Sequence, residues 1–120
     1  MQSNLINTFL KLFSIIYLFI LTMALLVPIN FFLEKNVVER EPTNETGYLI
    51  HLILFFILLI IFYISFKNKK KILFFCSSYG VLVEFAQIPT SRGFSLEDVF
   101  YNLVGISIAY ILMKYLYKFR

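Results

Sequence analysis

Four long apolar segments, separated by short polar connections, make up most of this sequence. They run over about residues 9–33, 48–66, 72–88 and 99–117. A helix that crosses the hydrocarbon core of a bilayer needs about 20 mostly apolar residues, and each segment reaches or approaches that length. Charged residues make up only 15% of the 120-residue chain, whereas soluble domains carry about 25%. The sequence therefore predicts a single all-α domain over residues 1–120, a polytopic membrane protein with four transmembrane helices.

The charges of the connections predict the orientation of these spans. Residues 67–71 hold four lysines and no acid, whereas residues 34–45 hold four glutamates and two bases. Because positively charged connections stay in the cytoplasm, we expect the lysine turn, and with it both termini, to be cytoplasmic. Residues 34–46 and 89–97 then lie outside. The first segment lacks a small-residue cleavage site after its apolar stretch, which favours a retained helix over a signal peptide.

Several function classes are not expected from this chain. It has one cysteine, Cys76, so it forms no intrachain disulfide, and it contains none of the common zinc, phosphate or dinucleotide motifs. We therefore expect no cofactor. The formal net charge is +4, but the basic residues lie between apolar segments and form no patch of the kind that binds nucleic acid. Membrane lipids are the expected surroundings.

Polar side chains gather at the end of the spans that is predicted to face outside. They are His51, Glu84, Gln87, Arg92, Asp98 and Asn102. Ionisable residues within a membrane span are energetically costly and are usually functional or paired. We therefore predict that these six side chains form one ligand-binding site at the outer leaflet.

Helical spacing predicts how the third and fourth spans pack. One face of the third span carries Ser77, Gly80, Glu84 and Gln87, and one face of the fourth carries Asp98, Asn102, Gly105 and Ala109. On each face the small residues lie deeper and the polar residues nearer the surface. Small residues allow close approach of helices in lipid, and polar groups form hydrogen bonds between them. We expect these two faces to contact each other.

Each candidate residue also has a purely structural interpretation. Glu84 and Arg92 would form an ion pair that fastens a hairpin. Asp98 would stabilise the N-terminus of its helix through the helix dipole, and the two amide side chains would form hydrogen bonds between helices. His51 would face lipid headgroups. The gathering of all six residues at one level, more than any one of them, indicates a site.

The spacing of particular residues in the second half of the chain also resembles that of a known family. The residues are His51, Glu84, Gln87, Pro89, Arg92, Ser95, Asp98, Asn102 and Gly105. This pattern, over about residues 48–117, resembles the VanZ-like family of small bacterial membrane proteins. The resemblance implies a protein of the bacterial cell membrane linked to resistance to teicoplanin, a lipoglycopeptide that binds cell-wall precursors. Many members carry Asp-Lys shortly before the histidine, and this chain lacks that pair.

Three functions are compatible with these residues. In the first, which we expect, the site binds or modifies a lipid-linked cell-wall precursor or an amphiphilic antibiotic, and Arg92 holds a phosphate or carboxylate. In the second, the chain is a membrane enzyme in which His51, Glu84 and Asp98 supply acid–base groups or ligate a metal with Asn102. In the third, the chain is a structural accessory protein. If the site binds a ligand in this way, no resident metal is expected. The sequence predicts neither the identity of the ligand nor the oligomeric state.

Overall fold

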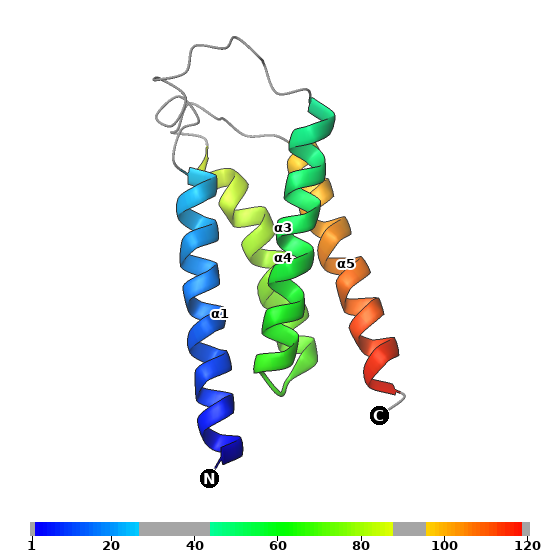
Figure 1. Ribbon diagram of the computed structural model, residues 1–120. Helices are drawn as coiled ribbons and strands as arrows, with labels where there is room; N and C mark the ends of the chain where they lie inside the picture. Colours follow the sequence, from blue (N-terminus) through cyan, green and yellow to red (C-terminus); the bar gives the residue numbers. More distant parts are fainter. Residues whose placement is uncertain (1, 27–43, 88–95, 119–120) are drawn as a thin grey trace.

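The computed structural model describes residues 2–26, 44–87 and 96–118, which form four α-helices (Figure 1). The helices are α1 (Gln2–Leu26), α3 (Asn44–Ser65), α4 (Lys69–Ala86) and α5 (Leu96–Lys118). The described part of the chain contains no strand, which confirms the predicted all-α class. The predicted site residue Arg92 lies outside the described residues, as do residues 27–33 at the end of the first predicted span.

Three of these helices are long and apolar enough to cross a membrane by length and composition. They cover Asn4–Leu26, Tyr48–Ser65 and Leu96–Lys118. Helix α4 has 18 residues, and its sequence includes three lysines at the start and Glu84 near the end. At 1.5 Å per residue it is about 27 Å long, close to the thickness of the hydrocarbon core. Its length would thus suit a span, but α4 is not among the helices that are apolar enough to be identified as one. A fourth span stays a prediction.

Helix α1 begins at Gln2, well before the predicted start of the first span near Phe9. Its first turns contain polar residues, and the hydroxyl of Thr8 donates to the carbonyl oxygen of Asn4 at 2.9 Å within the helix. Hydropathy identifies only the apolar stretch of a membrane helix. The difference arises because the helix continues beyond that stretch.

Helix α3 occupies the centre of the bundle. Both α3 and α4 contact all the other described helices, but the contact between α3 and α5 is the most extensive; α1 and α5 make no direct contact within the described residues. Its side chains Phe55, Leu58 and Leu59 are completely buried, and Leu21 and Leu25 of α1 belong to the same core cluster. The start of α1, the turn between α3 and α4, and the end of α5 all lie at one end of the bundle (Figure 1). This arrangement is the one that four antiparallel spans would produce.

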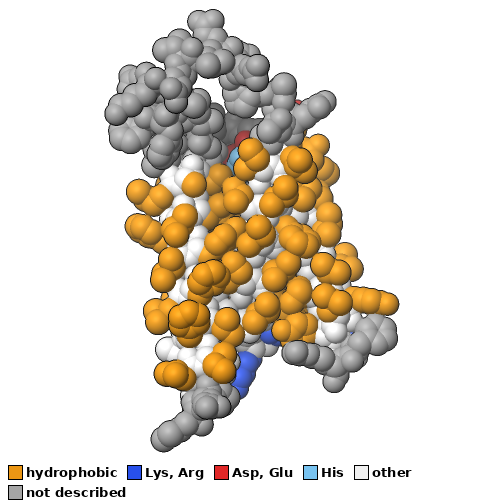
Figure 2. Space-filling view, in the orientation of Figure 1, with side chains coloured by type: hydrophobic (Ala, Val, Ile, Leu, Met, Phe, Trp, Pro, Cys, Tyr) orange, Lys and Arg blue, Asp and Glu red, His pale blue; other side chains and the backbone are white. Residues whose placement is uncertain are grey.

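The outer surface of the bundle is largely apolar. Figure 2 shows hydrophobic side chains along the middle of the visible face, with Lys or Arg at one end and His and acidic side chains at the other. Phe74 and Leu82 of α4 are 76% and 63% exposed, similar to Ile111 of α5 at 68%. An apolar surface this extensive is rare on soluble monomers and is the surface that lipid tails cover. Helix α4 therefore shares the exposed apolar side chains of its longer neighbours.

Two side chains hold the short turn between α3 and α4. Oδ1 of Asn68 accepts a hydrogen bond from the backbone N–H of Lys71 at 3.1 Å, which caps the start of α4. Nζ of Lys69 donates to the carbonyl oxygens of Tyr63 and Phe66, the latter at 2.6 Å. The carbonyl group of Tyr63 belongs to the last turn of α3, where carbonyl groups lack partners within the helix, and that of Phe66 directly follows the helix. Lys69 therefore has a structural role in addition to its contribution to the charge of the turn.

Hydrogen bonds between side chains join α1 to the rest of the bundle. The hydroxyl groups of Ser14 and Ser65 lie 2.6 Å apart and are buried between α1 and α3. The hydroxyl groups of Thr22 and Tyr79 lie 2.5 Å apart between α1 and α4. Neither pair was predicted from the sequence, where the first span is apparent only as an apolar segment. Helix α1 is thus joined to its neighbours by hydrogen bonds as well as by apolar packing.

Candidate functional site

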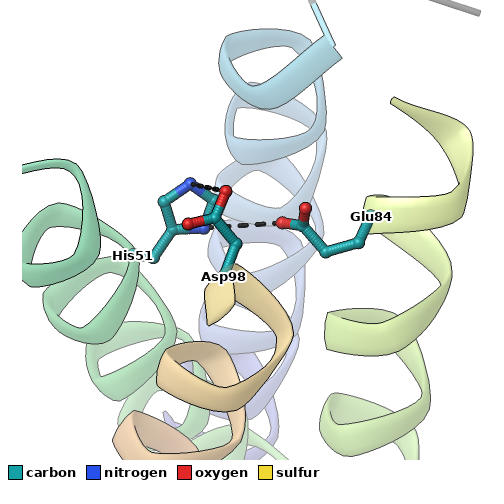
Figure 3. Close-up of side chains that lie close together, drawn as sticks. All are labelled: His51, Glu84 and Asp98. Carbon is teal, nitrogen blue, oxygen red and sulfur yellow. Dashed lines mark ion pairs between the residues drawn. The ribbon is translucent and has the colours of Figure 1, made fainter. Parts of the chain in front are cut away.

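Four polar side chains from three helices meet at the end of the bundle opposite the lysine turn. His51 comes from α3, Glu84 from the last turn of α4, and Asp98 and Asn102 from the first turns of α5. Figure 3 shows the ring of His51 beside the carboxylates of Asp98 and Glu84, with an ion-pair contact from each ring nitrogen to one of them. The structure therefore brings together four of the six residues that the sequence singled out.

The His51 ring contacts a different partner at each nitrogen. Its Nδ1 lies 2.9 Å from Oδ1 of Asn102 and 3.6 Å from Oε1 of Glu84. Its Nε2 lies 3.7 Å from Oδ2 of Asp98. One imidazole thus links α3 to α4 and α5, and it contacts two acids that belong to different helices.

The amide of Asn102 determines which ring nitrogen carries the proton in neutral His51. Its Nδ2 donates to the carbonyl oxygen of Gly80 at 3.1 Å and lies 3.4 Å from Oε1 of Glu84. Both of these partners accept hydrogen bonds, so Oδ1 of Asn102 is the atom that faces the histidine. An amide oxygen can only accept a hydrogen bond. In neutral His51 the proton therefore lies on Nδ1, and Nε2 presents its lone pair toward Asp98.

Three side chains of the cluster are buried, and the fourth is partly exposed. Glu84 and Asn102 are completely buried and His51 is 7% exposed, whereas the side chain of Asp98 is 20% exposed. Because burying a charged group without partners is costly, the contacts among these side chains compensate for removal from water. Asp98 is therefore the member of the cluster whose side chain is most exposed to solvent.

Helix electrostatics accounts for one of the two acids but not for the other. Asp98 lies in the first turn of α5, where the helix dipole favours a negative charge. Glu84 lies near the end of α4, where the same dipole disfavours it. Glu84 therefore contributes nothing favourable to its own helix through the dipole. Its completely buried position between His51 and Asn102 is the strongest indication that these residues form a site.

The glycines of the two predicted faces have different nearest neighbours, although both lie close to α3. A Cβ atom at Gly80 would lie 3.4 Å from Cβ of Asn102, so this part of α4 does face α5 as predicted. A Cβ atom at Gly105 would lie 2.3 Å from the carbonyl oxygen of Leu52 in α3. The expectation that Gly105 packs against the third span is therefore wrong. Its absent side chain allows α5 to approach the backbone of α3, which is the central helix.

The two other predicted site residues have different outcomes. Gln87 is buried, and its Nε2 donates to the carbonyl oxygen of Leu25 at 2.8 Å, which connects the end of α4 to the end of α1. This contact matches the alternative in which an amide serves as a hydrogen bond between helices. Arg92 lies outside the described residues, so its place in the site stays a prediction.

A pair of aromatic rings beside the cluster was missed from the sequence. The rings of Tyr48 and Tyr101 stack with centroids 4.9 Å apart and an angle of 7° between their planes. Tyr48 lies about one helical turn before His51, and Tyr101 directly precedes Asn102. Their proximity to two candidate residues was the available signal, but pairing between separate helices cannot be seen in the sequence. The pair joins α3 to α5 next to the polar cluster.

Comparison with known proteins identifies a family for this chain. The model of a family described as VanZ/LLP1 matches residues 3–117, nearly the whole chain. No curated protein and no solved structure matches the chain. The resemblance that can be recognised in the sequence covers about residues 48–117. The family match extends further toward the N-terminus and includes α1.

Proposed function

The chain belongs to the VanZ/LLP1 family, and we propose that it is a four-span protein of a bacterial cell membrane with a ligand site at the outer leaflet. This site binds the polar headgroup of a lipid-linked or amphiphilic ligand of the cell envelope. One observation carries the proposal: His51, Glu84, Asp98 and Asn102 meet at the end of the bundle opposite the lysine turn. Lysine-rich turns mark the cytoplasmic side, so the cluster belongs to the outer side.

The composition of the cluster supports recognition of a headgroup. Histidine and asparagine supply both donors and acceptors, and the carboxylates accept hydrogen bonds from hydroxyl, amide or amine groups. Arg92, in the connection that leads to Asp98, adds a planar group suited to phosphate or carboxylate. The exposed apolar surface around the bundle would hold the acyl or prenyl chain of the same ligand. A lipid-linked cell-wall precursor and a lipoglycopeptide such as teicoplanin both combine these two parts.

A resistance assay tests the proposal in cells. The chain and its variants are expressed in a teicoplanin-sensitive Gram-positive host, and the minimal inhibitory concentration is measured with the amount of membrane-inserted protein. We expect the wild type to raise resistance and Glu84→Gln or Arg92→Ala to abolish that increase. The control is Glu97→Gln, which removes a negative charge from an exposed position next to Asp98 and should leave resistance intact.

A binding assay tests the same proposal without cells. Purified protein in detergent is titrated with a polyprenyl-pyrophosphate lipid, and bound lipid is counted by native mass spectrometry. Loss of a hydrogen bond to a charged group weakens binding by roughly tenfold or more, so we expect at least that effect for Glu84→Gln. Equal binding by wild type, Glu84→Gln and Arg92→Ala, together with unchanged resistance, would contradict the proposal.

A second candidate function is acid–base catalysis on an envelope lipid. The observation that favours it is the position of His51 beside two carboxylates, with Nδ1 near Glu84 and Nε2 near Asp98. A histidine oriented by one acid is a common general base. Turnover of a lipid-linked substrate by the wild type, with a loss in His51→Gln and none in Glu97→Gln, would support this function over binding alone.

A further inference from the structure

The polar cluster contains the donor atoms of a metal site. One nitrogen of His51 and one carboxylate oxygen from each of Glu84 and Asp98 all lie within 4.8 Å of one another. The three residues come from three different helices, as Figure 3 shows. A set of one imidazole and two carboxylates matches the nitrogen and oxygen ligands that Zn²⁺ takes in proteins.

The hydrogen bond from His51 to Asn102 prepares the other ring nitrogen for a metal. A histidine that binds a metal through one nitrogen usually donates the proton of its other nitrogen to a carbonyl or carboxylate oxygen. Here Nδ1 of neutral His51 donates to Oδ1 of Asn102 at 2.9 Å. Asn102 is itself oriented by the carbonyl oxygen of Gly80. The lone pair of Nε2 is therefore available on the side that faces Asp98.

The distance between the two nearest donor atoms suits a shared ion. Nε2 of His51 and Oδ2 of Asp98 lie 3.7 Å apart, which is longer than a hydrogen bond. Bonds from Zn²⁺ to imidazole nitrogen and carboxylate oxygen are about 2.1 Å, so one ion can join two atoms separated by up to about 4.2 Å. Oε1 of Glu84 lies 3.6 Å from Nδ1 of the same ring, and one of its oxygens lies within 4.8 Å of a donor atom of His51 and of Asp98. Glu84 would therefore become the third ligand only after its carboxylate moves toward the ion.

We propose that His51, Glu84 and Asp98 bind a divalent transition-metal ion of the Zn²⁺ class at the outer end of the bundle. Asn102 is a positioning residue that holds the imidazole in the tautomer that the metal requires. The partial exposure of Asp98 provides the entry path and leaves a coordination position for water or a further ligand. This inference goes beyond headgroup binding, because the ion needs no lipid in order to bind.

Titration with the metal alone tests the proposal. The full chain is purified in detergent without a polyhistidine tag, treated with a chelator, and titrated with Zn²⁺ by isothermal calorimetry. We expect one saturable site per chain. We expect at least roughly tenfold weaker binding for His51→Gln and Asp98→Asn, and a loss of similar size for Asn102→Leu, since residues that orient metal ligands affect affinity by about 10–100-fold. The matched control, Glu97→Gln, should bind as the wild type does.

A spectroscopic measurement separates a true site from a loosely bound ion. His51 is the only histidine of the chain, so an imidazole signal in the zinc X-ray absorption spectrum identifies it as a ligand. Thermal unfolding of every variant shows which remain folded, and Asp98→Asn is the variant least expected to disturb the core because Asp98 is partly exposed. No saturable binding by the wild type, no imidazole signal, or undiminished binding by folded Asp98→Asn would overturn the proposal. These outcomes would leave headgroup binding untouched, since no lipid is present.

Discussion

The side-chain oxygen of Asn102 lies 2.9 Å from Nδ1 of His51 and joins α5 to α3 at the polar end of the bundle. This contact has a consequence for the chemistry of the site, because an amide oxygen can only accept and so places the proton of the neutral ring on Nδ1. The same amide donates to the backbone of α4. One asparagine therefore connects three helices and orients the histidine.

Replacement of Asn102 by leucine should destabilise the bundle. Leucine has a similar size but leaves Nδ1 of His51 and the carbonyl oxygen of Gly80 without this partner in a buried place. Hydrogen bonds between membrane helices contribute about 1–2 kcal/mol in model systems, and we expect a loss of that size or slightly more. Thermal unfolding in detergent measures it. Ser107→Ala, at an exposed position of the same helix, is the control, and equal midpoints for the two variants would contradict this role of Asn102.

Alanine substitutions at Gly105 and Gly80 should differ in their effect on the stability of the bundle. A methyl group at Gly105 would lie 2.3 Å from the carbonyl oxygen of Leu52, so Gly105→Ala must push α5 away from α3. Overpacking of this kind costs about 1–3 kcal/mol. At Gly80 the nearest atoms would lie 3.4 Å away, so Gly80→Ala should be close to neutral. Unfolding midpoints of both variants test the difference, and a larger loss for Gly80→Ala would show that the helix contacts are wrongly assigned.

The sequence predicted the residues of the cluster better than the contacts between helices. Helical spacing is a local property, so it correctly grouped Gly80 with Glu84, and Asp98 with Asn102. The partner of each face depends on how the whole bundle packs. Gly105 was expected to face the third span but packs against α3, the helix with which α5 makes its most extensive contact.

The contact between Ser14 and Ser65 could not be predicted from the sequence for a related reason. A serine in an apolar helix often bonds to the carbonyl group one turn earlier in its own helix, so its presence does not indicate a partner. The carbonyl oxygens of Leu10 and Ile61 lie within hydrogen-bond distance of Ser14 and Ser65 in this way, and the two hydroxyl groups also lie 2.6 Å apart. Because each hydroxyl has one proton, one serine donates to the other while the second donates to a carbonyl group. The sequence contains the two hydroxyl groups, but only the folded bundle brings them together.

The Ser14–Ser65 pair should show a measurable coupling. The two hydroxyl groups lie 2.6 Å apart between α1 and α3 and are buried. A double-mutant cycle with Ser14→Ala, Ser65→Ala and the double variant isolates their interaction. We expect a coupling of about 0.6 kcal/mol, the average found for such pairs in a membrane protein. The free energies of unfolding are measured in detergent, and strict additivity of the two single variants would exclude a direct bond.

Lys69 should stabilise the bundle more than the lysine next to it. Its Nζ donates to two carbonyl oxygens at the end of α3 and lies 4.4 Å from the centroid of the Tyr63 ring. Lys70 is exposed and has the same charge. We expect Lys69→Ala to lower the free energy of unfolding by about 1 kcal/mol and Lys70→Ala to leave it nearly unchanged. If the two variants unfold at the same temperature, the cap contributes nothing.

Cysteine labelling in intact cells tests the orientation and the fourth span together. The native Cys76 is replaced by alanine, and single cysteines are introduced as Lys70→Cys at one end of α4 and Glu97→Cys at the start of α5. Both positions are exposed.

If positive connections are cytoplasmic and α4 crosses the bilayer, a membrane-impermeant maleimide should label Glu97→Cys in intact cells. It should label Lys70→Cys only after the cells are permeabilised. Labelling of both positions from one side would mean that α4 does not cross, and the reverse pattern would place the polar cluster in the cytoplasm.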